Sequence, residues 1–154
     1  MTLLRRAKDL YLFQLGRREK GLLLGLLRLY PRVPSAYQRL SKSPGLDDAS
    51  QKLLDDALAE QRAENKNRLH SWLTAPNRFV EHQGHWRLSL SPPELEWLLQ
   101  ILNDIRLGSW IILGSPQTRV GPVTEQTAPH IWAMEMAGTF QMAFLAAIEG
   151  KGET

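Results

Sequence analysis

The chain has 154 residues, 43% of them hydrophobic, which suits a single domain over 1–154 with one core. It has no cysteine, which excludes a disulfide framework and a thiolate nucleophile, and which favours a cytoplasmic location. The net charge of +3 hides an asymmetry, because residues 1–42 carry ten Lys or Arg against two acids, and residues 43–154 carry nine against fourteen.

The first predicted elements are a strand over residues 8–15 and a leucine-rich helix over residues 17–30, separated by Gly16. The strand is apolar on both faces, so we expect both faces to be covered. Pro31 cannot continue the helix. The start lacks a signal-peptide cleavage pattern, and the leucine run has about half the length of a membrane span, so we predict no membrane association.

Residues 31–46 have the Pro, Gly and Ser content of a loop, which we expect to be mobile. Asp47 and Asp48 then begin a helix that reaches residue 73, with acids where the helix dipole favours them. Its middle, residues 59–68, has almost no apolar side chain, so this section either faces solvent or covers something polar. Glu60 and Glu64 lie one turn apart, and an exposed pair is favoured over a metal site because no His shares their face.

Residues 78–90 predict a β-hairpin with its turn near Gln83 and Gly84, and residues 86–90 alternate apolar and polar side chains. His82 and His85 flank the turn, but zinc requires three or four ligands and the other His residues lie elsewhere. We therefore predict no metal site and no cofactor.

The central element is a helix that follows this strand directly. Ser91 and Glu94 have the spacing of a capping box, with prolines between them in the first turn. Six apolar residues lie on one face at 100° per residue: Leu95, Leu98, Leu99, Leu102, Ile105 and Ile112. Arg106 falls on the same face and needs an acidic or carbonyl partner if it is covered. A structural ion pair with Glu135 is favoured over an anion-binding site.

The strand and helix pattern occurs twice. Aligning residues 13–19 with residues 88–94 matches Leu15 with Leu90 and Glu19 with Glu94, and the leucines of the two helices also coincide. Chance matches and a true duplication remain equally open. A duplication predicts two strand–helix units around a pseudo-twofold axis, with their strands in one small sheet.

The last predicted helix covers residues 130–148 and is apolar nearly all round, so we expect it to be largely enclosed. Its Met and aromatic side chains are more typical of a core than of a partner-binding groove. A homodimer would bury any side that the monomer leaves uncovered.

The chain has no G-x-G-x-x-G, P-loop, G-x-S-x-G or H-E-x-x-H motif, which disfavours an enzyme. The fold prediction is α+β, predominantly helical, with about four helices and a small antiparallel sheet. We favour a non-enzymatic protein-interaction or self-association module. One alternative is a nucleic-acid-associated regulator that uses the basic N-terminal segment. Another is a small-anion binder or enzyme at Arg106, together with Asp104 or Glu135.

Residues 95–108, with Asn103, Asp104 and Arg106 among their leucines and Gly108 at their end, carry a family resemblance. This run resembles the core segment of a bacterial family catalogued as a domain of unknown function, the DUF twenty-seventeen family. The resemblance implies no catalytic residues. Members are often encoded near an adaptor of the Clp protease, which implies a link to protein turnover, and some are labelled transcriptional regulators. Asn103, Asp104, Arg106 and Glu135 are the candidate binding residues.

Overall fold

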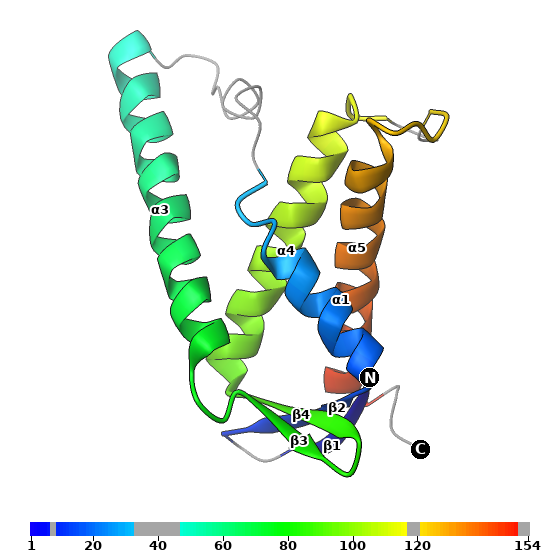
Figure 1. Cartoon of the computed structure of the whole chain (residues 1–154). Helices are drawn as coiled ribbons and strands as arrows, with labels where there is room; N and C mark the ends of the chain where they lie inside the picture. The colour runs from blue at the N-terminus through cyan, green and yellow to red at the C-terminus, as the bar shows by residue number, and fades with distance from the viewer. Residues whose placement is uncertain (7–8, 33–46, 117–120, 151–154) are drawn as a thin grey trace.

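The computed structural model describes residues 1–6, 9–32, 47–116 and 121–150. These residues form a four-stranded antiparallel sheet and four helices, which confirms the predicted α+β class (Figure 1). In chain order the elements are β1 (Thr2–Arg6), β2 (Tyr11–Leu15), α1 (Arg17–Leu27), α3 (Asp48–Thr74), β3 (Phe79–His82), β4 (His85–Leu90), α4 (Pro92–Ile112) and α5 (Ala128–Ile148). The predicted loop over 31–46 lies outside the described residues from 33 onward.

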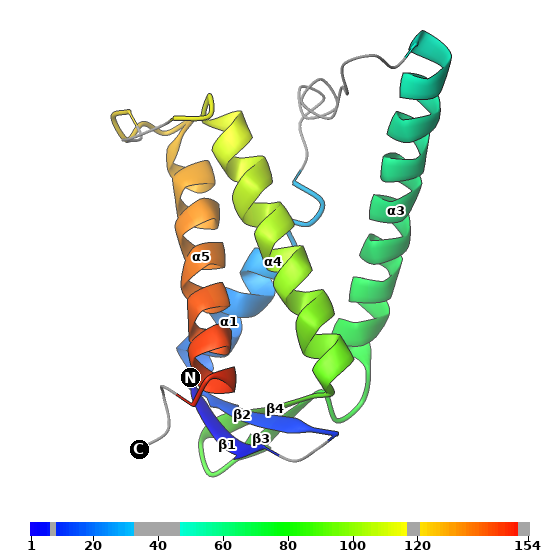
Figure 2. The same ribbon diagram turned by 180° about the vertical axis from the view of Figure 1, so that it is seen from behind.

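The sheet lies across one end of the helices in the order β1-β2-β4-β3 (Figures 1 and 2). Its inner face carries four fully buried side chains, Phe13, Leu15, Leu88 and Leu90. The prediction that both faces of the strand over residues 8–15 are covered is wrong, because Leu10 is 41% exposed and no described helix lies on the outer side of the sheet. Strand β1 was not predicted, since its sequence TLLRR does not alternate.

The two central strands pair with the symmetry that the predicted duplication requires. Phe13 pairs with Leu88, its own counterpart in the sequence match, and Leu15 pairs with Trp86 as Tyr11 pairs with Leu90. A pseudo-twofold axis therefore passes between Phe13 and Leu88. The two strands share one sheet, as we predicted for two related strand–helix units.

The helices that follow these strands begin in the same way. Glu19 accepts a hydrogen bond from the backbone N–H of Gly16 at 2.9 Å, and Glu94 accepts one from the N–H of Ser91 at 2.9 Å. Each carboxylate also meets a cation beside the start of an edge strand: the Met1 amino group lies 2.5 Å from Glu19, and an Arg78 nitrogen lies 2.6 Å from Glu94. Burial raises the pKa of Glu94, but hydrogen bonds from Ser91 and the pairing with Arg78 outweigh it and hold that pKa below its ordinary value.

The core fills the space between the sheet, α1, α4 and α5. Phe144 of α5 is fully buried and meets the Phe13 ring edge-on at 5.1 Å between centroids. Ala133 and Ala137 are also fully buried, and α5 packs along α4. Helix α1 ends at Leu27, three residues before the predicted end, and the chain then crosses α4. A Cβ on Gly108 would lie 1.6 Å from the carbonyl oxygen of Arg32, so only glycine fits there.

The prediction that helix α5 is largely enclosed is wrong. Its exposed side includes Met142 at 72%, Leu145 at 44% and Trp132 at 38% exposure. One flank of α5 packs on α4 and the core, while the opposite flank faces away from every described element (Figures 1 and 2). Helix α5 therefore carries more apolar side chains than the core of the monomer buries.

Helix α3 joins the core only near its carboxyl end. Leu69 and Trp72 are buried there, and the Trp72 ring lies 6.2 Å from the ring of Trp97 on α4. Figures 1 and 2 show α3 diverging from α4 toward its amino end.

Candidate functional site

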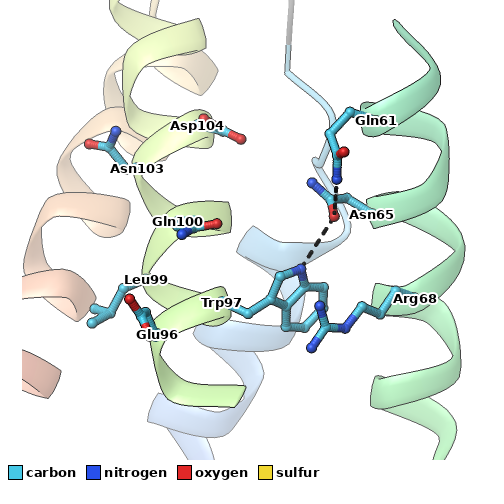
Figure 3. A pocket seen from close by; sticks show the side chains of 9 residues that line it. All are labelled: Gln61, Asn65, Arg68, Glu96, Trp97, Leu99, Gln100, Asn103 and Asp104. Atoms are coloured by element: carbon cyan, nitrogen blue, oxygen red, sulfur yellow. Dashed lines mark hydrogen bonds between the residues drawn. The ribbon is translucent and has the colours of Figure 1, made fainter. Parts of the chain in front are cut away.

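A cleft of about 670 Å³ separates the middle of α3 from α4 (Figure 3). Its wall on α3 consists of Gln61, Asn65 and Arg68, which extend toward α4. Gln100 and Asp104 extend from α4 toward α3. For residues 59–68 of α3, the sequence allowed either exposure to solvent or contact with something polar. In the structure this section lines a polar cleft.

The narrow end of the cleft is closed by a small polar network. The indole N–H of Trp97 donates to Asn65 at 3.4 Å, and the Asn65 amide donates to the Tyr30 hydroxyl at 3.3 Å. The guanidinium of Arg68 lies over the Trp97 ring, 4.4 Å from its centroid. These contacts hold the middle of α3 against α4.

Asp104 lies at the other end of the cleft. Burial raises the pKa of its carboxyl above the ordinary value, and the positive charge of Arg62 lowers it by less. No described residue donates a hydrogen bond to this carboxylate. A half-buried carboxylate with few partners can accept hydrogen bonds from a ligand.

The four residues that the sequence singled out do not form one cluster. Asn103 and Asp104 line the cleft, whereas Arg106 and Glu135 do not. Asn103 accepts a hydrogen bond from Arg106 at 2.9 Å and one from Gln141 of α5 at 3.5 Å. Arg106 is exposed instead of lying on the buried face, and no ion pair joins it to Glu135. The placement on the leucine face was wrong because Arg106 lies at its edge, against α5.

The aliphatic part of Arg106 packs across α5 at Gly138, where a Cβ would lie 3.7 Å from the Arg106 Cδ. Glu135 is exposed and precedes Gly138 by three residues, which is about one helical turn. Arg106 and Glu135 therefore lie on the same side of the α4–α5 pair, beside the exposed apolar side chains of α5.

Part of the basic N-terminal segment is used within the fold. Arg6 donates to the carbonyl oxygen of Ile148 at the carboxyl end of α5, and the Lys20 ammonium lies over the Trp86 ring. Arg32 contacts His130, whose pKa is lowered by burial and by the charge of Arg32. Arg17 and Arg18 are exposed. Fewer positive charges are thus free to contact nucleic acid than the ten Lys and Arg residues of this segment suggest.

Sequence reasoning missed the residues that define the cleft, notably Gln61, Asn65, Arg68 and Gln100. The available signal was the long stretch of α3 without apolar residues. Among the residues that the structure describes, no group of three or more His, Asp or Glu side chains could hold a metal ion.

By length and composition, α5 is the one helix in the described parts of the chain that could cross a membrane. Length and composition are weak evidence, since core helices pass the same test. No family model, no curated protein and no solved structure matches this chain.

Proposed function

We propose that this protein is a non-enzymatic interaction module that binds a second copy of itself through the outer face of α5. The observation that carries the proposal is the group of large apolar side chains exposed on this one helix, Trp132, Met142 and Leu145. Grouped apolar side chains on a protein surface are typical of interaction sites. The exposed residues Trp132, Glu135, Thr139 and Met142 follow at spacings of three, four and three, so they form one stripe.

Two charges at this face, Glu135 within the stripe and Arg106 near it, favour a second copy over an unrelated partner. Arg106 and Glu135 lie on the same side of the α4–α5 pair, and neither forms an ion pair with a described residue. In a twofold dimer each residue of one protomer meets its complement on the other. Arg106 of each protomer can therefore face Glu135 of its partner, which gives two symmetric ion pairs across the interface.

The test is sedimentation equilibrium over a concentration series, from about 1 to about 300 µM. We expect the wild type to form a dimer and Met142→Glu to remain monomeric, because the new charge would be buried in the interface. Leu53→Glu on α3 is the matched control, since Leu53 is 71% exposed and Met142 is 72% exposed. It should dimerise like the wild type.

Reversing the charges of Arg106 and Glu135 tests whether these two residues pair across the dimer. Arg106→Glu should weaken the dimer about tenfold by placing like charges together, and adding Glu135→Arg should restore it. A wild type that stays monomeric throughout, or a control that weakens the dimer as much as Met142→Glu, contradicts the proposal. A cytoplasmic location, membership of the DUF twenty-seventeen family and its link to Clp-type turnover stay predictions.

A further inference from the structure

The cleft between α3 and α4 differs from the α5 face in chemistry and in position. We propose that it binds a short zwitterionic peptide in an extended conformation, with the ligand ammonium at Asp104 and the ligand carboxylate at Arg68. This inference does not depend on the dimer, because the two proposed ligand contacts, Asp104 on α4 and Arg68 on α3, are not part of the exposed face of α5.

The charge arrangement of the cleft sets the two ends of the ligand. Helices α3 and α4 run antiparallel (Figure 1), so Gln61 lies opposite Asp104 at the open end, and Arg68 lies opposite Trp97 at the closed end. One end therefore offers the carboxylate of Asp104, on which the charge of Arg62 also acts, and the other offers the guanidinium of Arg68. Arg68 forms no ion pair with any residue that the structure describes, so its donors are free for a carboxylate.

The middle of the cleft carries carboxamides. Asn65 and Gln100 extend into it from opposite sides (Figure 3), and the Gln61 amide at the open end donates to Asn65 at 3.4 Å. A carboxamide both donates and accepts hydrogen bonds, as a peptide group does, so Gln100, which bonds to no residue that the structure describes, can pair with the backbone of an extended ligand.

The length of the cleft matches a tripeptide. Trp97 and Asp104 are seven residues apart on α4, and Gln61 and Arg68 are seven apart on α3. Seven residues of helix span about 10.5 Å. Three residues of extended chain also span about 10 Å. The cleft volume of about 670 Å³ accommodates such a ligand with its side chains.

Other polar ligands fit less well. A phosphate or nucleotide would meet two carboxylates, Asp104 and Glu96, against the one guanidinium of the lining. A sugar usually stacks on an aromatic face, but Arg68 covers the face of Trp97.

The experiment is a ¹⁵N–¹H NMR titration that follows the indole N–H of Trp97, assigned with Trp97→Phe. The probe is trialanine with free termini, compared with N-acetyl-trialanine and trialanine amide. We expect trialanine to shift the Trp97 indole signal with saturation below about 10 mM. Acetylation of the peptide or Asp104→Asn should each weaken binding about tenfold, and amidation or Arg68→Gln should weaken it similarly.

Pairing the variants with the capped peptides shows which end each residue binds. Asp104→Asn should not weaken binding of the acetylated peptide any further, because that peptide has no ammonium to pair with Asp104. Glu64→Gln removes an exposed carboxylate of α3 outside the cleft lining and serves as the control, with unchanged binding expected. Absence of a shift with all three peptides, or equal binding of free and capped peptides, overturns the proposal. Thermal melting of each variant verifies folding.

Discussion

The two flanks of α4 are built from different chemistry. Toward α5, α4 packs closely along a helix with fully buried apolar side chains such as Ala133, Ala137 and Phe144. Toward α3, carboxamides and charges face each other across a cleft. Buried apolar area provides most of the stability of a fold, whereas polar contacts at a wet surface contribute little. The difference indicates that the α5 flank holds the fold together and that the α3 flank is available for binding.

The largest expected difference between the two flanks of α4 is in the free energy of unfolding lost when a side chain is truncated. Phe144→Ala should lower the free energy of unfolding by about 4 kcal/mol, because it removes a fully buried ring that packs on Phe13. Asn65→Ala, on the α3 flank, should cost about 1 kcal/mol for its hydrogen bonds to Trp97 and Tyr30. Urea unfolding followed by circular dichroism measures both. Equal losses would show that the polar flank also holds the fold.

A second test concerns the close approach at Gly108. Gly108→Ala should destabilise the protein by about 3 kcal/mol, because the new Cβ would collide with the backbone of Arg32. Gly21→Ala in α1 is the matched control: a Cβ there has no neighbour within 4 Å, so the better helix propensity of alanine should stabilise the protein by about 0.5–1 kcal/mol. Thermal melting of the two variants should therefore shift in opposite directions. A stable Gly108→Ala would disprove this close contact between Arg32 and α4.

The smallest effect is expected at Asp104. Its pKa is raised in the folded state above 3.8, so the ionised carboxylate destabilises the fold at neutral pH, and this penalty disappears as the pH falls below 3.8. Asp104→Asn should therefore raise the free energy of unfolding by about 0.5 kcal/mol at pH 7 and leave it unchanged at pH 3. Unfolding curves at both pH values measure this.

The pKa of Glu94 is shifted in the opposite direction to that of Asp104, so ionised Glu94 stabilises the fold. Its folded pKa lies below 4.5, so it contributes stability above that value that is lost as the pH falls through the folded pKa. Glu94→Gln should destabilise the protein at pH 7 and have less effect at low pH. If Asp104→Asn destabilised the protein at neutral pH as well, Asp104 would be a structural residue like Glu94 and a poor candidate for ligand binding.

Local patterns predicted several elements well. The spacing of Ser91 and Glu94 predicted the start of α4, and both bonds of the capping box are present. The turn at Gln83 and Gly84 also lies where we predicted it, and both residues have positive φ. Such features depend on contacts between residues near each other in the chain. Strand β1 was missed because its pairing with β2, and not its own pattern, makes it a strand.

The sequence by itself determined the α+β class, the capped helix starts and the match between two strand–helix units, because hydrophobic periodicity and short-range hydrogen bonds are encoded in neighbouring residues. Only the tertiary structure decided which apolar residues are covered and which polar residues meet. Periodicity predicted an enclosed α5 and a buried Arg106, but exposure depends on how many elements surround a helix. The cleft likewise depends on the angle at which α3 diverges from α4, and that angle is set by contacts between residues far apart in the chain, such as Trp72 with Trp97.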